Sequence, residues 1–237
     1  MTDIEPQCLA VVTGAAGGIG RAVTAALADA GHTVIGVDLV AEADPSASAA
    51  LGADLADPDA IEHLFRTIEK EHGLPGVLIN NAGVYDARDF LDYTPDDYRR
   101  VFDVNVGAMF FCTQEFSRRL IAADLPGSVV NIASISGQTG SPDPGYAASK
   151  GAVITLTRSL GRALAAHRIR VNAVAPGVID TAMAAHIPPD RADDYRARIP
   201  LGRFGTAAEV ADAVRYLASP AASYVTASVF DVNGGLH

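Results

Sequence analysis

Short apolar runs alternate with longer amphipathic patterns along the whole chain, and this alternation restricts the fold more than any other feature. Continuous apolar runs are typical of strands buried on both faces, and parallel strands need helical connections between them. We therefore expect one α/β domain over residues 1–237, a doubly wound parallel sheet of about seven strands with helices on both faces. The predicted strands are Cys8–Thr13, Thr33–Asp38, a weaker Ala50–Asp54, Val77–Asn80, Ser128–Ser134, Arg170–Ala175 and Ser228–Val232.

Clear helix start signals lie between these runs. Asp57-Pro58-Asp59 supplies a cap and a proline at the first helical position, and Thr94-Pro95 repeats the device. Thr206 with Glu209 forms a capping box. We expect one helix from Pro95 to about Leu120, and only an abbreviated helix in the short Ala/Ser-rich link from Asp38 to Asp54. There is no linker or repeat, and so no predicted domain boundary.

The composition argues against several classes of protein. A net charge of −10 disfavours nucleic acid and anionic membranes as partners. No apolar run approaches the roughly 20 residues that span a bilayer, and residues 1–7 lack the pattern of a signal peptide. Cys8 and Cys112 lie in apolar stretches, so we expect two buried thiols in a reducing cytoplasm. The six histidines are scattered, and no metal site is predicted.

The first predicted strand runs into a glycine-rich turn, Thr13-Gly14-Ala15-Ala16-Gly17-Gly18-Ile19-Gly20-Arg21. Glycines let the backbone approach an anion closely, and the free amides at a helix N-terminus bind it. Such a loop can also be a purely structural turn. Its place after the first strand of a βαβ unit favours a dinucleotide pyrophosphate site.

Asp38 ends the second predicted strand, eighteen residues after Gly20. A carboxylate there can accept hydrogen bonds from the adenosine ribose and repels a 2′-phosphate. Since Ala15, Ala16 and Leu39 supply no cation for such a phosphate, we expect NAD rather than NADP. A simple turn or cap residue is the alternative interpretation. Asp54, at the end of the third strand, could likewise meet the adenine amino group or cap the strand end.

Tyr146 and Lys150 lie four residues apart in a predicted helix, which places both side chains on one face. A cation beside a phenol favours the phenolate and lowers its pKa towards working pH, as a general acid/base requires. The spacing alone is typical of a solvated helix face. However, the chain has sixteen arginines and only two lysines, Lys70 and Lys150. Because arginine and lysine are not interchangeable at such sites, a lysine at position 150 favours a specific role for its ammonium group.

Seven features follow one another in a fixed order: T-G-x-x-x-G-I-G at 13–20, Asp38, N-N-A-G at 80–83, Asn105, Ser134, Y-x-x-x-K at 146–150 and P-G-x-x-x-T at 176–181. This ordered set resembles the short-chain dehydrogenases/reductases over residues 8–235. The resemblance implies a single-domain Rossmann-type oxidoreductase that prefers NAD and interconverts a secondary alcohol and a ketone.

The resemblance also implies roles for individual residues. Tyr146 would be the general acid/base, and Lys150 would lower its pKa and bind the nicotinamide ribose. Ser134 would orient the substrate oxygen, although Ser136 lies two residues on and competes for that role. Asn105 would hold a water chain that leads to the lysine and relays protons.

Further residues would hold the cofactor. Thr181 would contact the nicotinamide carboxamide, and Val178 would contact the ring through its backbone. The complete implied set is Gly14, Gly18, Ile19, Gly20, Asp38, Asp54, Leu55, Asn81, Ala82, Gly83, Tyr146, Lys150, Pro176, Gly177, Val178 and Thr181. The chain departs from the family at Asn233, where an aspartate is usual, and we expect this to affect packing rather than chemistry.

Three segments would surround the substrate: Tyr85–Asp92, Ile135–Pro144 and a lid-like insertion over 182–205. The insertion carries His186, Arg191, Arg196 and Arg198, which could bind a carboxylate or simply form a solvated helix face. Ile199-Pro200-Leu201-Gly202-Arg203 and the short link before Asp54 look like the dihydroxybenzoate dehydrogenases of the family, so a dihydrodiol dehydrogenase is one alternative.

A nucleotide-sugar epimerase would need an additional C-terminal domain, and a non-catalytic dinucleotide sensor is expected to lack Tyr146 or Lys150. The helices that begin near Pro95 and Pro144 are apolar on more than one side. The family pairs these two helices, so the resemblance implies a homotetramer or homodimer that binds a small-molecule substrate.

Overall fold

The computed structural model describes residues 8–42, 44–181 and 189–236, and its centre is a seven-stranded sheet in which every pairing is parallel. The strand order is β3-β2-β1-β4-β5-β6-β7. The chain therefore winds outwards from β1 to one edge, returns to β4 beside β1, and winds to the other edge. In such sheets ligands bind at the carboxyl ends of the strands where the order reverses, here between β1 and β4. The strands are β1 Leu9–Thr13, β2 Thr33–Asp38, β3 Ala49–Gly52, β4 Val77–Asn80, β5 Gly127–Ile132, β6 Ile169–Pro176 and β7 Val229–Val232.

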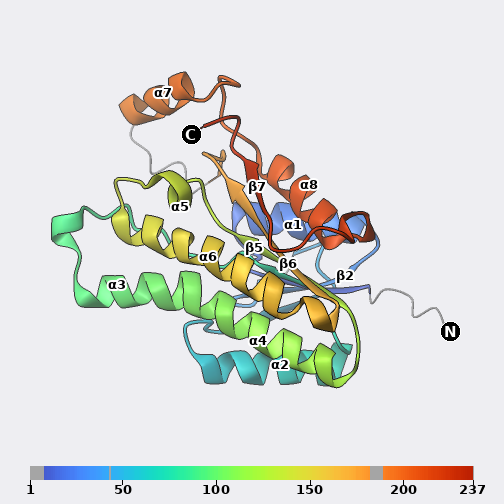
Figure 1. Cartoon of the computed structure of the whole chain (residues 1–237). Helices are drawn as coiled ribbons and strands as arrows, with labels where there is room; N and C mark the ends of the chain where they lie inside the picture. The colour runs from blue at the N-terminus through green and yellow to red at the C-terminus, as the bar shows by residue number, and fades with distance from the viewer. Residues whose placement is uncertain (1–7, 43, 182–188, 237) are drawn as a thin grey trace.

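Helices cover both faces of the sheet (Figure 1). Helices α1 and α8 pack against each other on one face, and α2, α4 and α6 lie on the other. The α-helices are α1 Gly18–Asp29, α2 Pro58–His72, α3 Pro95–Phe102, α4 Ala108–Ala122, α5 Ser136–Thr139, α6 Pro144–Ala163, α7 Pro189–Arg198 and α8 Ala207–Ala218. Short helical turns are η1 Phe90–Asp92, η2 Asp103–Gly107, η3 Ala165–His167 and η5 Pro220–Ala222.

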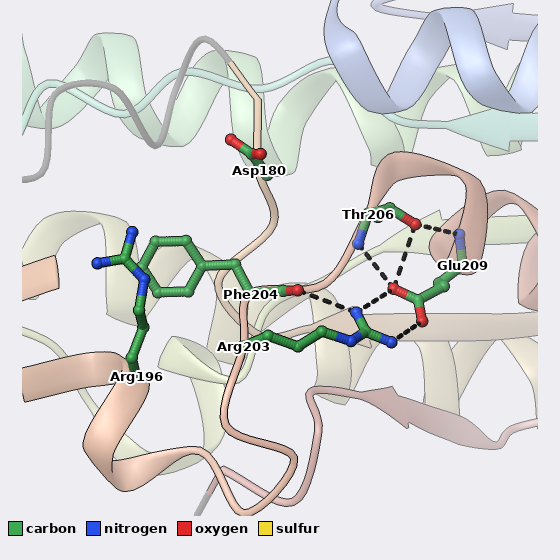
Figure 2. Close-up of a pocket in the computed structure, with 6 residues that line it drawn as sticks. All are labelled: Asp180, Arg196, Arg203, Phe204, Thr206 and Glu209. Carbon is green, nitrogen blue, oxygen red and sulfur yellow. Dashed lines mark hydrogen bonds and ion pairs between the residues drawn. The ribbon is translucent and has the colours of Figure 1, made fainter. Parts of the chain in front are cut away.

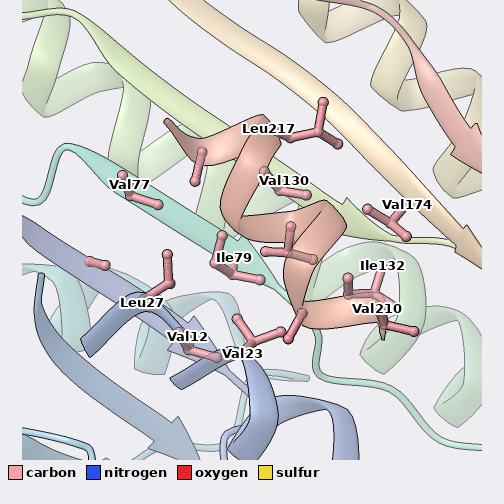
Figure 3. Packing of buried hydrophobic residues seen from close by; sticks show 14 of the residues in the cluster. Val12, Val23, Leu27, Val77, Ile79, Val130, Ile132, Val174, Val210 and Leu217 are labelled. Atoms are coloured by element: carbon pink, nitrogen blue, oxygen red, sulfur yellow. The ribbon is translucent and has the colours of Figure 1, made fainter. Parts of the chain in front are cut away.

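The strands are continuously apolar because alternate residues enter two different cores. Val12 faces the core beneath α1 and α8, which Figure 3 shows, whereas its neighbour Val11 faces the core beneath α2 and α4. The first core joins strand residues to Leu27 and Leu217 of the helices, and the second is centred on Phe116. The burial of both faces is the physical reason for the sequence pattern that predicted the fold.

The predicted fold class is confirmed, and so are all seven strands, with ends that differ by one or two residues. The described residues between β2 and β3 form bends and a turn and include no helix, in agreement with the abbreviated link. The prediction of one helix from Pro95 to Leu120 is wrong. A π-helical turn, η2, separates α3 from α4 and contains Asn105. Such wide turns are frequent at functional sites, and this one directs the Asn105 side chain to the backbone of Val84.

The expectation of two buried cysteines is half right. Cys112 is buried in the core beneath α2 and α4, whereas Cys8 is exposed because it precedes β1. In the part of the chain that the structure describes, none of the helices combines the length and apolar character needed to cross a bilayer.

Candidate active site

The glycine-rich loop joins β1 to α1 at the switch point. Gly14 adopts a φ of +63°, in the left-handed region that side chains disfavour. Gly20 is buried, and a Cβ there would overlap with the Gly14 carbonyl oxygen, so only glycine lets α1 begin so close to the loop. No side chain caps α1 at Gly17, and its first amides stay available for an anion.

The N-N-A-G turn after β4 braces this loop. Asn81 Nδ2 donates hydrogen bonds to the carbonyl oxygens of Thr13 at 3.1 Å and Gly14 at 2.9 Å. The Thr13 hydroxyl in turn accepts from the backbone amides of Asn81 and Ala82. The ends of β1 and β4 are therefore joined by hydrogen bonds. The Asn81 side chain holds the glycine-rich loop in place, and its side-chain amide is already hydrogen-bonded to that loop.

Asp38 lies against the same loop. Its Oδ2 accepts a hydrogen bond from the Ala16 amide at 3.0 Å, and its Oδ1 accepts one from the Leu39 amide at 2.8 Å. The carboxylate is thus held at the entrance to α1. Arg21 Nε donates a hydrogen bond to the Ala16 carbonyl oxygen at 2.9 Å, and its guanidinium is paired with Glu42 at 2.9 Å and with Asp44 at 3.5 Å.

Asp54 and Leu55 differ from the other predicted cofactor residues, because their observed contacts are those of a strand-end cap and of a core residue. Asp54 is exposed, and its Oδ1 accepts a hydrogen bond from the Ala56 amide, as the strand-end cap interpretation expects. The Leu55 side chain is buried in the core beneath α2. A contact of Asp54 or Leu55 with adenine stays a prediction.

Helix α6 carries the tyrosine–lysine pair. Lys150 Nζ lies 5.7 Å from the centre of the Tyr146 ring, so the predicted shared face is confirmed. Lys150 is only 5% exposed, and its ammonium donates a hydrogen bond to the Ile132 carbonyl oxygen at 2.8 Å. The Cβ position of Gly83 is 3.5 Å from the same nitrogen, which brings the N-N-A-G turn against the lysine.

The pKa of Tyr146 moves in the direction opposite to the one expected from the sequence. Burial raises it to about 12, nearby Tyr85 and Asp143 also raise it, and a hydrogen bond with Ser134 opposes the rise. Burial lowers the pKa of Lys150 to about 8. The protein alone therefore holds Tyr146 as a neutral phenol, which is the form that donates a proton.

Ser134, rather than Ser136, contacts the tyrosine. Ser134 follows β5, is nearly buried, and makes a hydrogen bond that affects Tyr146. Its Oγ also accepts a hydrogen bond from the Ser136 amide at 3.1 Å, which fixes the turn into α5. The geometry thus supports the role given to Ser134 in the sequence prediction.

Asn105 is 2% exposed and joins three segments. Its Oδ1 accepts from the Val84 amide at 2.7 Å, and its Nδ2 donates to the Val84 carbonyl oxygen and to Ser149 Oγ. Ser149 then donates to the carbonyl oxygen of Tyr146 at 2.7 Å. Ser149 was missed from the sequence, although it lies inside the Y-x-x-x-K motif, because a buried helix serine has no pattern of its own.

Tyr85 was also missed as an individual residue. Its ring meets the Tyr146 ring edge-on, with centroids 5.0 Å apart, so it forms one wall beside the phenol. The sequence placed the segment Tyr85–Asp92 near the substrate, and this contact is consistent with that placement.

The segment after β6 returns to the glycine-rich loop. The Gly177 amide donates to the Val232 carbonyl oxygen at 3.0 Å, and Val178 follows it. Thr181 Cγ2 lies 2.8 Å from the Cβ position of Gly18, so the predicted nicotinamide residue is at the start of α1. Asn233 is buried and bonds to the backbone of Gly235 and Leu236, which confirms a packing role.

Part of the predicted lid lies outside the described residues, including Ala182, His186 and the side chain of Arg191. A cavity of about 490 Å³ lies beside the rest of it. Figure 2 shows the residues that line this cavity. The Arg196 guanidinium lies 4.6 Å over the Phe204 ring and pairs with Asp193, and Arg203 pairs with Glu209. The cavity is lined by Asp180, Arg196, Arg203, Phe204, Thr206 and Glu209.

These residues fit a nicotinamide dinucleotide. The glycine-rich loop offers free amides for a pyrophosphate, Asp38 lies where an adenosine ribose would reach, and Thr181 lies beside the start of α1. The opposite end of the same edge carries Tyr146 and Lys150.

Comparisons with known proteins agree with this geometry. The sequence model of a family described as enoyl-(acyl carrier protein) reductase matches residues 14–237. The 3-oxoacyl-[acyl-carrier-protein] reductase FabG of Thermotoga maritima is 38% identical over 95% of this chain and 96% of that protein. The cis-4-hydroxycyclohexanecarboxylate dehydrogenase of Sinomonas cyclohexanicum is 38% identical over 99% of this chain and 98% of that protein.

Solved structures give the same result. A short-chain type dehydrogenase/reductase from Mycobacterium marinum has a TM-score of 0.91 and 32% identity, covering 96% of this chain and 94% of that one. A protein described as a 2-deoxy-D-gluconate 3-dehydrogenase from Agrobacterium tumefaciens, with bound NADP, has a TM-score of 0.88, 38% identity and coverage of 96% and 95%. A 4-hydroxyisoleucine dehydrogenase complexed with NADH has a TM-score of 0.87, 30% identity and coverage of 96% and 97%. The chain therefore belongs to the short-chain dehydrogenase/reductase family.

Proposed function

We propose that this protein is an NAD(H)-dependent oxidoreductase that interconverts a secondary alcohol and a ketone. Its relatives are dehydrogenases and reductases that act on CH–OH groups. The observation that carries the proposal is the meeting of Ser134, Tyr146 and Lys150 at the sheet edge that also holds the glycine-rich loop.

In the direction of reduction, a nicotinamide held by the glycine-rich loop and Thr181 would supply a hydride for the carbonyl carbon. Ser134 donates a hydrogen bond to the carbonyl oxygen and holds it beside the phenol. Tyr146 then gives its hydroxyl proton to that oxygen, so the product is a neutral alcohol. Lys150 stabilises the phenolate that remains until a proton returns. Asn105 and Ser149 hold the first turns of α6 in place through the Tyr146 carbonyl oxygen.

The central test of this proposal is Tyr146→Phe. The variant keeps the ring against Tyr85 and removes only the hydroxyl, so kcat should fall by about 1,000-fold. A panel of ketones and alcohols followed by NADH absorbance gives the reference turnover. NADH affinity, measured by fluorescence, should stay unchanged. Tyr224→Phe is the control, because Tyr224 is fully exposed.

Turnover by Tyr146→Phe within a few-fold of the wild-type rate would contradict the proposed role. Binding of NADH without turnover of any compound in the panel by the wild-type enzyme would instead favour the sensor alternative.

We propose NAD as the preferred cofactor because the Asp38 carboxylate lies against the glycine-rich loop, where it would repel a 2′-phosphate. Arg21 is paired with the carboxylates of Glu42 and Asp44, which partly neutralise its charge. Solved relatives hold NADP in one case and NADH in another, so the cofactor has to be measured in this protein. We expect kcat/KM to be at least about tenfold higher with NADH than with NADPH. Asp38→Ala should narrow that ratio, and a wild-type preference for NADPH would reject the assignment.

The described part of the segment 182–205 is proposed as one wall of the substrate site. Ile199 is buried with Ile135 and Leu236, and the Leu201 amide donates to the Gly234 carbonyl oxygen. The C-terminal turn therefore anchors the base of this segment. The dihydrodiol alternative stays open, since the names of the relatives cover different substrates.

We also propose a homo-oligomer within this one-domain chain, a tetramer or a dimer. Several residues that suggested a second buried face, such as Met109 and Phe116, are already buried within one chain. The exposed side chains of Phe90, Leu91 and Tyr98 are better candidates for an interface. Light scattering that shows only a 24.5 kDa species would reject the oligomer. A cytoplasmic location stays a prediction.

A further inference from the structure

Asp143 precedes helix α6 and is almost entirely buried, with 1% of its surface exposed. It is the N-cap of that helix, and its Oδ1 accepts a hydrogen bond from the Tyr146 amide at 2.9 Å. The residue that would transfer the proton is therefore held directly by this cap.

The same carboxylate oxygen accepts a second hydrogen bond, from the hydroxyl of Tyr93 at 2.6 Å. Tyr93 belongs to the segment that follows the N-N-A-G turn. A Cβ at Gly145 would lie 2.5 Å from the Tyr93 hydroxyl oxygen, so this contact requires a glycine immediately before Tyr146. Two segments about fifty residues apart are thus joined at the first turn of α6.

The second carboxylate oxygen of Asp143, Oδ2, is buried and has no hydrogen-bond partner among the described residues. Asparagine caps helices as well as aspartate and would accept both of the observed hydrogen bonds. What aspartate adds is a negative charge, which is costly to bury even at a helix N-terminus that partly compensates it. A charge retained at such a place beside Tyr146 indicates a role beyond capping.

Two ion pairs hold the segment that carries Tyr93. Arg88 lies 3.1 Å from Asp97, and Arg100 lies 2.7 Å from Asp86, so the segment is fixed to α3 as well as to α6. Tyr85, at the start of this segment, contacts the ring of Tyr146, and Asp143 binds its backbone amide.

We propose that Asp143 and Tyr93 form a clamp that positions Tyr146 and that holds the buried Asp143 carboxylate beside it. This inference rests on the proposed role of Tyr146 as the proton donor. Asp143 and Tyr93 are positioning residues, because they act through Tyr146 and not on the substrate.

Several titratable groups face the clamp. Tyr85, Asp143 and Lys150 face Tyr146, from the segment after β4 and from α6. Asp86 and Arg88 act on Tyr93 together with Asp143. The Asp143 charge raises the pKa of Tyr146, so its removal should lower that pKa, whereas removal of the Tyr93 hydroxyl leaves the charge in place.

The test compares Asp143→Asn with Tyr93→Phe in the full-length protein. NMR of ring-labelled tyrosine follows the ionisation of Tyr146, whose signal is assigned by its loss in Tyr146→Phe. We expect Tyr146 to titrate about one pH unit lower in Asp143→Asn and no lower than wild type in Tyr93→Phe. The pH profile of kcat/KM for alcohol oxidation should shift in the same direction in Asp143→Asn, because oxidation requires the phenolate.

Two results would overturn the proposal. One is a Tyr146 titration in Asp143→Asn that matches wild type, since asparagine would then restore everything that aspartate supplies. The other is an equal downward shift in both variants, which a general loosening of the structure would produce. The NMR titration needs no substrate, so it tests the clamp even if the wild-type protein turns over nothing and the proposed function fails.

Discussion

Two regions of the molecule meet along one edge of the sheet. The cofactor region consists of residues 13–21, Asp38 and the turn at 80–83. The catalytic region consists of Asn105, Ser134 and residues 143–150. The cofactor region is built mainly from backbone, with a positive φ at Gly14 and free amides at the start of α1. The catalytic region is built from buried side chains: Asn105 donates to the Ser149 hydroxyl, and Lys150 donates to the Ile132 carbonyl oxygen.

This difference has a physical cause. A pyrophosphate is a large anion that many backbone amides can bind, so close approach matters more than side-chain identity. Proton transfer needs one hydroxyl at one position with a controlled pKa, and only an interlocked set of side chains provides that. The two regions should therefore fail in different ways when they are mutated.

The strongest test of the cofactor region is Gly20→Ala. The added Cβ would overlap with the Gly14 carbonyl oxygen and push α1 away from the loop, so NADH affinity should fall by about 100-fold. Isothermal titration measures this affinity. Gly107→Ala is the matched control, because a Cβ there lies no nearer than 3.8 Å to another atom. Equal NADH affinity in Gly20→Ala and wild type would show that NADH binding does not depend on the close backbone approach at Gly20.

Lys150→Met tests whether the catalytic region reduces stability. Burial lowers the pKa of Lys150 to about 8 from 10.5, so the folded protein binds fewer protons than the unfolded chain between those values. The free energy of unfolding of the wild type should therefore rise across this window. Below it, the buried charge is a cost that methionine removes, so Lys150→Met should be more stable at neutral pH by about 2 kcal/mol.

Urea denaturation of the cofactor-free protein at neutral pH and near pH 10 measures the effect of Lys150→Met. Lys70→Met, at the exposed lysine of α2, is the control and should change neither value. A Lys150→Met variant that is less stable than wild type at neutral pH would show that the catalytic region imposes no such cost.

Ser149→Ala gives the smallest expected effect and separates the two regions. The change removes the hydrogen bond to the Tyr146 carbonyl oxygen and leaves Asn105 Nδ2 with one partner fewer, so kcat should fall about tenfold. NADH affinity should be unchanged. Ser159→Ala, an exposed serine of α6 that bonds to Thr155 in a similar way, is the control. Loss of NADH affinity in Ser149→Ala would contradict the prediction that the two regions fail independently.

The cofactor region could be predicted from the sequence because its signals are local. Glycines within eight residues, an aspartate at a strand end and an N-N-A-G turn are all visible without knowledge of the packing. The strands could be predicted for the same reason, since burial on both faces leaves continuous apolar runs.

The catalytic region could be predicted only in part. Tyr146 and Lys150 follow from spacing and resemblance, but the contacts of Asp143 with Tyr93 and of Ser149 with Asn105 join distant segments and leave no periodic signal. The π-helical turn at Asn105 was unexpected because apolar periodicity cannot distinguish a wide turn from a regular one. The direction of the Tyr146 pKa was wrong because the prediction counted the lysine and not the burial.

The all-parallel sheet also determines how the chain must reach this structure. Each strand pairs with a partner across a connection, and the central pairing of Ala10 with Val77 closes a long loop. Because every strand pairing joins segments that are separated in the sequence, folding should be slow and sensitive to aggregation of incomplete chains. During synthesis the brace of Asn81 on the glycine-rich loop can form once β4 has emerged. The bond from Lys150 to the Ile132 carbonyl oxygen has to wait for β5 and α6, so the chain can complete its anion cradle before its proton donor.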